Sequence, residues 1–226
     1  MKRAILLGSL VLILGFASSS ASADTIFSLN TEGCSSGCNI LPAGTVTLQQ
    51  NGTNDVSVTV LLDSNYSFRH ANDSNHWAFV FDLASGIPAP TASNINGYGQ
   101  TFSFLAPDSY HDSPQGDFPY AFDCTTCSTG GNAGTTTQKL SFDLIATGLT
   151  EASFISNGSF FFAADVVGLT NAAGKGDTGN VGATGPGTPG GDVDTRTATA
   201  PEPSTLMLFG TGVTALGGLI RRRMAA

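Results

Sequence analysis

Basic residues are scarce in this sequence, and most of them lie near its two ends. The chain of 226 residues has nine Lys and Arg against seventeen Asp and Glu. Residues 24–200 contain only four of the nine, Arg69, Lys139, Lys175 and Arg196, against sixteen acidic residues, a net charge of −12. Nucleic acids and anionic lipid surfaces bind proteins through basic patches. The shortage of positive charge therefore excludes nucleic acid as an expected partner of this region.

Helical periodicity is also missing. Between residues 24 and 167 apolar and polar residues alternate with the period of half-buried strands, most clearly over 55–62, where Val56, Val58 and Val60 share one face. The strands predicted in this way are 26–29, 45–49, 55–62, 76–83, 99–105, 118–122, 138–145, 152–155 and 159–167. Many short strands without long helices predict an all-β fold, an antiparallel β-sandwich of the jelly-roll type, with most of the fifteen phenylalanines in its core.

Turn residues and a proline predict how some of these strands are arranged. Residues 51–54, Asn-Gly-Thr-Asn, predict a hairpin between 45–49 and 55–62. Pro119 interrupts 118–122, and proline cannot donate a hydrogen bond within a sheet. The segment 118–122 is therefore predicted at a sheet edge.

The end of the strand-rich region allows two interpretations. A turn at 156–158, Ser-Asn-Gly, predicts that 152–155 and 159–167 form the last strand pair. Residues 151–156, which follow Thr150, form one short helical turn in the alternative interpretation.

The first 23 residues are predicted to be a signal peptide that directs export through Sec. Lys2 and Arg3 precede an apolar run over 4–17 and a group of small residues over 18–23. This order is typical of a segment that signal peptidase removes. Ala21 and Ala23 occupy the cleavage positions, so the mature chain is expected to begin at Asp24.

The composition changes after the strand-rich region. Residues 168–200 have no aromatic side chain, and Gly, Thr, Pro and Ala dominate them. We expect the β-sandwich domain to span 24–182 and a flexible Gly/Pro/Thr linker to span 183–200, with a reach of about 25 Å. Residues 201–226 form a separate C-terminal tail.

The tail has three parts in a fixed order. Its polar start, Pro-Glu-Pro-Ser-Thr, is followed by an uncharged apolar run that reaches Ile220 and contains four glycines, and then by three arginines. Counted from Thr205, the run predicts a short transmembrane helix, 205–220, of about 24 Å, shorter than a typical hydrocarbon core. The arginines, 221–223, would hold its end in the cytoplasm. A span this marginal predicts only transient anchoring in the inner membrane.

This tail resembles the PEP-CTERM sorting signal of Gram-negative bacteria over residues 201–224. The resemblance rests on Pro201, Glu202, Pro203, Ser204 and Thr205, on the glycine-containing apolar run, and on the basic stop of Arg221, Arg222 and Arg223. It implies recognition by an exosortase, a multi-pass membrane protease-transpeptidase, and removal of the tail near the Pro-Glu-Pro motif. The mature protein would then pass to the cell surface or to the extracellular polymer matrix. The resemblance implies a route and no activity.

Four cysteines form two close pairs, Cys34 with Cys38 and Cys124 with Cys127. In an exported chain they predict two disulfides, and pairing within each loop is the first of three possible connectivities. A zinc site made from the two pairs is the alternative, since structural zinc sites use such half-sites.

No catalytic motif is present, so we expect no enzyme activity. Residues 33–37, Gly-Cys-Ser-Ser-Gly, match the Gly-x-Ser-x-Gly spacing, but no helical pattern follows them as a nucleophile elbow requires, and no His-Glu-x-x-His is present. The three histidines and several loop carboxylates could together form the catalytic residues of a hydrolase, but such residues are common in any polar loop. The residues that such a secreted hydrolase would use are His70, His76 and His111 with Asp63, Asp73 and Asp112.

Two binding activities are alternative hypotheses. Acidic loops predict weak calcium sites at Asp63 with Asn65 and at Asp177 with Asn180, because calcium binds carboxylate and carbonyl oxygens. Tyr110 and Tyr120 flank the polar loop 111–117 and predict a carbohydrate-binding edge, whereas the alternation of residues 76–83 places Trp77 on the core side.

The sequence thus predicts an exported, exosortase-processed protein of the cell surface or extracellular matrix. Its expected role is structural or adhesive within exopolysaccharide or biofilm. A carbohydrate- or calcium-binding module is the first alternative, and a secreted hydrolase is the second. No cofactor is expected apart from the calcium candidates, and extracellular polysaccharide is the expected partner besides the processing enzymes.

Overall fold

A computed structural model describes residues 24–34, 38–70, 75–105, 107–129 and 137–187, which all belong to one compact unit, Ser22–Thr195. The predicted signal peptide, most of the predicted linker and the whole tail lie outside the described residues. The described part is all-β and antiparallel, and its one helical element is a single 3-10 turn, Glu151–Ser153.

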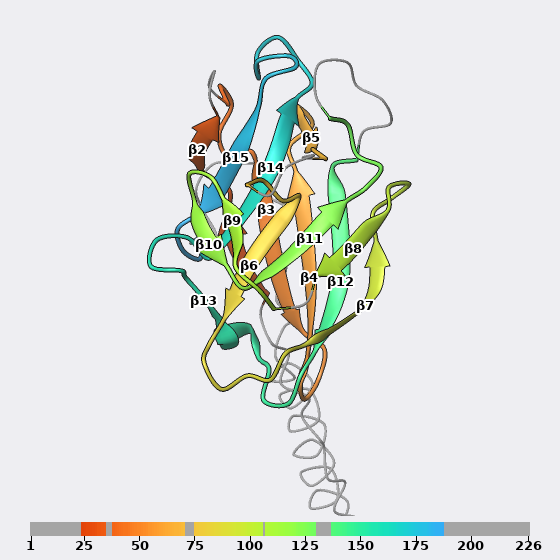
Figure 1. The fold of residues 1–226 in the computed structure, drawn as a ribbon, viewed down its shortest axis with the longest axis vertical. Helices are drawn as coiled ribbons and strands as arrows, with labels where there is room; N and C mark the ends of the chain where they lie inside the picture. The colour runs from red at the N-terminus through yellow and green to blue at the C-terminus, as the bar shows by residue number, and fades with distance from the viewer. Residues whose placement is uncertain (1–23, 35–37, 71–74, 106, 130–136, 188–226) are drawn as a thin grey trace, which may run out of the picture. The chain divides into compact units, whose positions relative to one another are not determined.

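Two sheets form the domain (Figure 1). The smaller sheet has the order β1-β3-β4-β12-β7, and the larger has the order β2-β15-β14-β6-β11-β8, with β5 paired to β14 and β13 paired to β6. A separate hairpin, β9-β10, completes the set. The strands are β1 Thr25–Ser28, β2 Thr31–Cys34, β3 Gly44–Gln50, β4 Asp55–Leu62, β5 Tyr66–Phe68, β6 Phe79–Leu83, β7 Thr91–Asn96, β8 Phe102–Leu105, β9 Tyr110–Asp112, β10 Gly116–Phe118, β11 Tyr120–Cys124, β12 Lys139–Ile145, β13 Phe154–Ile155, β14 Phe162–Gly168 and β15 Thr178–Ala183.

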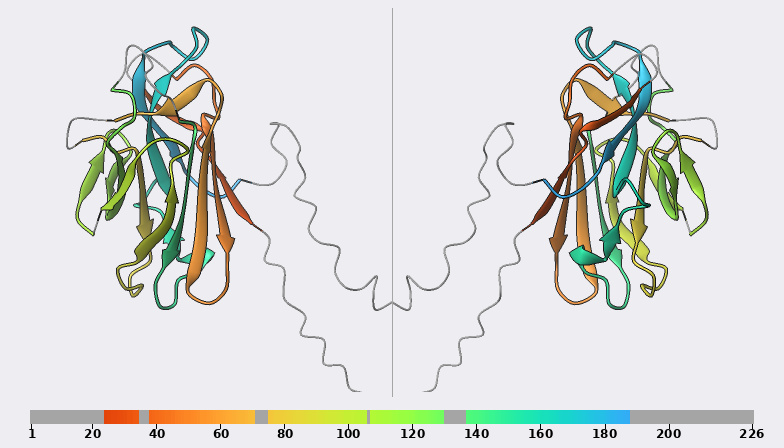
Figure 2. Two further views of the ribbon diagram at one scale, coloured as in Figure 1. Left: turned by 90° about the vertical axis from the view of Figure 1, so that its right-hand side faces the viewer. Right: turned by 90° about the vertical axis from the view of Figure 1, so that its left-hand side faces the viewer.

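The core lies between the two sheets, which Figure 2 shows from the side. Aromatic rings join the layers: Phe142 on β12 of the smaller sheet lies 4.2 Å, centroid to centroid, from Phe122 on β11 of the larger sheet. Phe79 and Phe81 on β6 also contact Phe142. These contacts confirm a phenylalanine-rich core in a β-sandwich.

A second, smaller apolar cluster covers the outer face of the larger sheet. Phe118 of the β9-β10 hairpin packs on Val80, Ala121 and Ala163, which are all buried. Trp77 packs against this cluster and not against the main core. The placement of Trp77 on the core side was therefore wrong, because β6 begins only at Phe79 and the alternation does not extend back to residue 77.

Segments with strong alternation of apolar and polar residues were predicted well as strands. β4 covers 55–62 as expected, β12 covers nearly all of 138–145, and the turn at 51–54 joins β3 to β4 in the predicted hairpin. Pro119 did not mark an edge, however. It stands before β11, which pairs with β6 on one side and β8 on the other.

The predicted last strand pair was also wrong. Residues 151–153 form the 3-10 turn, β13 pairs with β6, and β14 pairs with β15. The partner of β14 was missed because β15 is rich in glycine and has no aromatic residue. Beyond β15 the chain still contacts β1, where the Gly187 N–H donates to the Ile26 carbonyl.

Candidate functional site

A row of polar side chains crosses the outer face of the larger sheet. Asp165 on β14 is directly paired with Asn180 on β15, and Asn180 is paired with Gly33 on β2. Arg69, just after β5, donates its backbone N–H to the Asp165 carbonyl. Their neighbours Val166 and Val181 point into the core. Because side chains alternate along a strand, Arg69, Asp165 and Asn180 lie side by side on the opposite face.

The positive end of this row is charge-compensated. The Arg69 Nη1 lies 3.1 Å from the Asp165 Oδ2, and the Asp165 side chain is fully buried while that of Arg69 keeps 19% exposure. The Arg69 Nε is buried without a hydrogen-bond partner. This contact and the burial of Nε restrict the orientation of the guanidinium, and with it the directions of the remaining N–H donors.

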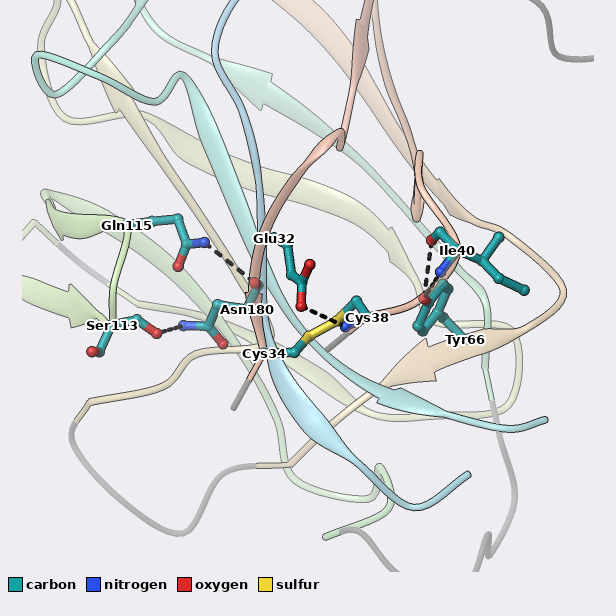
Figure 3. Close-up of a disulfide and its surroundings, with 8 residues drawn as sticks. All are labelled: Glu32, Cys34, Cys38, Ile40, Tyr66, Ser113, Gln115 and Asn180. Carbon is teal, nitrogen blue, oxygen red and sulfur yellow. Dashed lines mark hydrogen bonds between the residues drawn. A yellow bond between two sulfur atoms is a disulfide. The ribbon is translucent and has the colours of Figure 1, made fainter. Parts of the chain in front are cut away.

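The loop between β9 and β10 is fastened to the other end of the row. The Asn180 amide donates to the Asp112 carboxylate. It also donates to the Ser113 carbonyl at 3.0 Å (Figure 3). The Gln115 amide, 3% exposed, donates to the Asn180 carbonyl at 3.2 Å. These contacts hold residues 112–115 against β15.

The loop can approach this closely because Gly33 on β2 has no side chain. A Cβ on Gly33 would lie 2.5 Å from the Pro114 Cδ and 2.6 Å from the Gln115 Nε2. Contacts this short do not occur between real side chains, so any larger residue would displace the loop. Glycine is thus required here by close approach of another segment.

A pocket of about 420 Å³ opens between the row and the loop. Its volume falls in the range of small-molecule sites, about 300–1,000 Å³. Side-chain groups in the lining include a guanidinium, an imidazole ring and two hydroxyl-bearing residues. The lining residues are Gly33, Arg69, His76, Ser113, Pro114, Thr178 and Gly179.

The sequence had pointed to this pocket only in part. The loop 111–117, predicted as a carbohydrate-binding edge, supplies Ser113 and Pro114. Arg69, Thr178 and Asp165 were missed, and Asn180 was named only as a calcium candidate. An aspartate in the middle of the apolar run of β14 was the available signal, since a buried charge on a strand needs a partner.

The structure separates His70 and His111 of the proposed hydrolase residues but leaves Asp112 near His76, since Asp112 accepts the backbone N–H of Trp77 at 3.3 Å. His70 Nδ1 lies 3.4 Å from Asp123, and the exposed His111 lies 2.8 Å from Asp117. His76 lines the pocket together with Ser113. Asp63 lies in a turn after β4, and Asp73 lies outside the described residues.

The two predicted calcium pairs lie in different surroundings. The Asp63 carboxylate accepts hydrogen bonds from the backbone and side-chain nitrogens of Asn65, as in an Asx turn. The segment 177–180 was expected as a loop, but β15 begins at Thr178 and buries Asn180. Among the described residues no group of three or more His, Cys, Asp or Glu side chains could hold a metal ion.

The tyrosines proposed for sugar binding have separate environments. Tyr110 makes an edge contact with Trp77, centroids 5.1 Å apart, and burial raises the pKa of its hydroxyl. Tyr120 is buried and stacks on Phe81. Burial also raises the pKa of Tyr120, with the nearby Asp82 carboxylate adding to the shift. Tyr120 is therefore a core residue and not part of a binding edge.

Both cysteine pairs form local disulfides, Cys34–Cys38 and Cys124–Cys127, as the sequence predicted in preference to a zinc site. The first lies at the end of β2. Near it the Cys38 N–H donates to Glu32 at 3.1 Å, and the Tyr66 hydroxyl donates to the Ile40 carbonyl at 2.9 Å (Figure 3). The segment after the disulfide is thereby fixed to the sandwich.

The fold and the site describe an antiparallel β-sandwich domain with a polar pocket on the outer face of its larger sheet. Comparison with known protein families identifies the tail: residues 199–223 match the PEP-CTERM protein-sorting motif, at the position that the sequence indicated. No curated protein and no solved structure matches the chain.

The match covers the tail alone and leaves the domain unassigned. The motif is typical of exported proteins that an exosortase processes. None of the helices among the described residues is long and apolar enough to cross a membrane. The predicted membrane helix, 205–220, lies outside them.

Proposed function

We propose that this chain is a non-enzymatic protein of the cell surface or extracellular matrix, with a structural or adhesive role in exopolysaccharide or biofilm. The observation that carries the proposal is the PEP-CTERM motif at 199–223, which suggests export and exosortase processing. In this proposal signal peptidase removes 1–23, the tail holds the chain transiently in the inner membrane, and the sandwich domain is released outside.

The charge, the disulfides and the histidine environments of the domain support this proposal. A net charge of −12 over residues 24–200 favours solubility and disfavours attachment to anionic lipid. Two disulfides suit an oxidising compartment. The dispersal of His70 and His111 to separate carboxylates favours a structural or binding role over hydrolysis.

The route is tested by fractionating the native host with and without its exosortase. The wild-type chain should reach the surface or matrix fraction, whereas loss of the exosortase, or replacement of Pro201, Glu202 and Pro203 by alanine, should retain it in the inner membrane. Equal release from all three strains would contradict the proposed route.

The role is tested separately by deleting the gene and measuring the cohesion of cells in biofilm. Cohesion should fall, and the wild-type gene should restore it while the alanine tail variant should not. A deletion strain with unchanged cohesion would overturn the adhesive role even if the route is correct. Hydrolysis of any glycoside, ester or peptide by the purified chain, lost on His76→Ala, would overturn the non-enzymatic role.

A further inference from the structure

We infer that the pocket beside Arg69 binds a neutral sugar residue through two adjacent hydroxyl groups. This inference names the ligand class of the proposed adhesive domain and therefore rests on the proposed function. Four properties of the pocket support it: directed donors, compensated charge, rim hydroxyls and a size suited to a small ligand.

The donors come from Arg69. Its Nη1 lies 3.1 Å from the buried Asp165, and Arg69 lines the pocket with a side chain that keeps 19% exposure. A guanidinium presents its N–H groups as a planar fork that matches two oxygens at once. Adjacent hydroxyls on a sugar ring present two such oxygens, which can accept hydrogen bonds from the N–H groups that the ion pair with Asp165 leaves free.

The charge balance favours a neutral ligand over an anion. Asp165 compensates the charge of Arg69, and Asp112 lies buried on the other side of Asn180. The domain around the pocket is strongly acidic. A carboxylate or phosphate ligand would bring further negative charge into this field, whereas hydroxyl groups can donate and accept without that cost.

The residues at the rim of the pocket add polar and apolar surface, the combination that small-molecule sites usually have. Thr178 and Ser113 stand on opposite segments of the rim, and both are half-buried. Gly33, Gly179 and the Pro114 ring supply apolar C–H surface between them. Sites for small ligands usually combine such surface with a few placed polar groups.

The inference is tested by titrating the purified, exported protein with methyl glycosides of neutral hexoses, including one with a cis and one with a trans vicinal diol, and with methyl glucuronoside. Ligand-detected NMR and calorimetry measure the binding. At least one neutral hexoside should bind with a Kd of about millimolar, the range of weak single-site recognition, and more tightly than the glucuronoside.

Three variants locate the site. Arg69→Lys keeps the charge but removes the fork, and it should weaken binding about tenfold, the effect of losing one well-made hydrogen bond. Thr178→Val removes a rim hydroxyl without touching the Arg69–Asp165 pair, so it should weaken binding severalfold at an unchanged Tm. Lys139→Ala, on β12 of the smaller sheet, is the matched control and should bind as the wild type does.

Absence of binding by every neutral hexoside, tighter binding of the glucuronoside, or binding that Thr178→Val and Arg69→Lys leave unchanged would overturn the inference. Its failure can be told from that of the proposed function. If Thr178→Val and Arg69→Lys restore cohesion to the deletion strain as the wild type does, the sugar site is wrong and the adhesive role stands. If the pure protein binds a hexoside but deletion leaves cohesion unchanged, the adhesive role alone is wrong.

Discussion

Arg69 is one of only four Lys and Arg residues among residues 24–200, and it lies beside a fully buried carboxylate. Removing one partner of a buried ion pair leaves the other charge poorly compensated, and the cost usually exceeds that of removing both. The ion pair therefore matters less for its net free energy than for the position it gives the guanidinium. This is the residue on which the candidate site depends most.

Arg69→Ala is expected to lower the free energy of unfolding by about 2 kcal/mol, less than for a fully buried pair because Arg69 remains partly exposed. The double variant Arg69→Ala/Asp165→Ala should lose less than the sum of the two single variants, since the pair is coupled. Urea denaturation at pH 7 measures these differences, with the exposed Lys175→Ala as control. Additive losses would contradict a coupled pair.

Asp82 on β6 gives a pH-dependent prediction. Burial raises the pKa of its carboxyl above the ordinary value of 3.8, more than the hydrogen bond from the Leu83 N–H lowers it. A raised pKa means that the folded state holds the proton more tightly than the unfolded state. The contribution of Asp82 to stability therefore falls as the pH rises from its unfolded pKa through its folded pKa.

Asp82→Asn removes this cost and keeps an acceptor for the Leu83 N–H. Its Tm should exceed that of the wild type at pH 7, and the difference should disappear below about pH 4, where the wild-type carboxyl is protonated in both states. Thermal denaturation between pH 3 and pH 7 is the measurement. A lower Tm at neutral pH, or a gap that widens on acidification, would show that ionised Asp82 stabilises the fold.

At the scale of elements, the contact between β2 and the β9-β10 loop is the one most sensitive to side-chain size. Gly33→Ala should lower the Tm by several degrees and weaken sugar binding, because the new Cβ would meet Pro114 and Gln115. Gly185→Ala is the matched control, since no atom lies within 4 Å of its added Cβ. Equal effects of the two substitutions in thermal denaturation would contradict the packing described for the loop.

Elements with a clear apolar period could be predicted from the sequence, and those whose place depends on distant partners could not. β4 alternates over its whole length and was predicted to the residue. β15, with the sequence Thr-Gly-Asn-Val-Gly-Ala, resembles a linker in composition, yet it is buried. Gln115 and the ring of Phe160 cover Gly182, and Cys34 of β2 covers Gly179. Only the tertiary structure supplies that cover.

The candidate site shows the same division. The loop 111–117 was identified from its polar and aromatic residues, but the row of Arg69, Asp165 and Asn180 forms only when β5, β14 and β15 come together. Arg69 and its ion-pair partner Asp165 lie about a hundred residues apart in the sequence. The spacing of residues along the chain does not predict such a row, since strand pairing creates it, and the aspartate within the apolar run of β14 was the one available signal.

The whole molecule combines a β-sandwich domain with a sorting motif in a separate segment of the sequence. The tail motif at 199–223 suggests export and exosortase processing, and the sandwich, whose last described strand ends at Ala183, bears the pocket. Processing of the tail and sugar binding by the sandwich domain should therefore be independent of each other. Variants of the tail should change where the protein is found and leave the sugar affinity of the released domain unchanged.

The most direct test of the central claim is the intact mass of the protein isolated from the surface of its native host, compared with the protein from a strain without exosortase. The account predicts a mature chain that begins at Asp24, contains two disulfides and ends near the Pro201-Glu202-Pro203 motif, and an exosortase-free strain whose chain keeps the tail. A surface protein that retains Arg221, Arg222 and Arg223 in the presence of exosortase would contradict it.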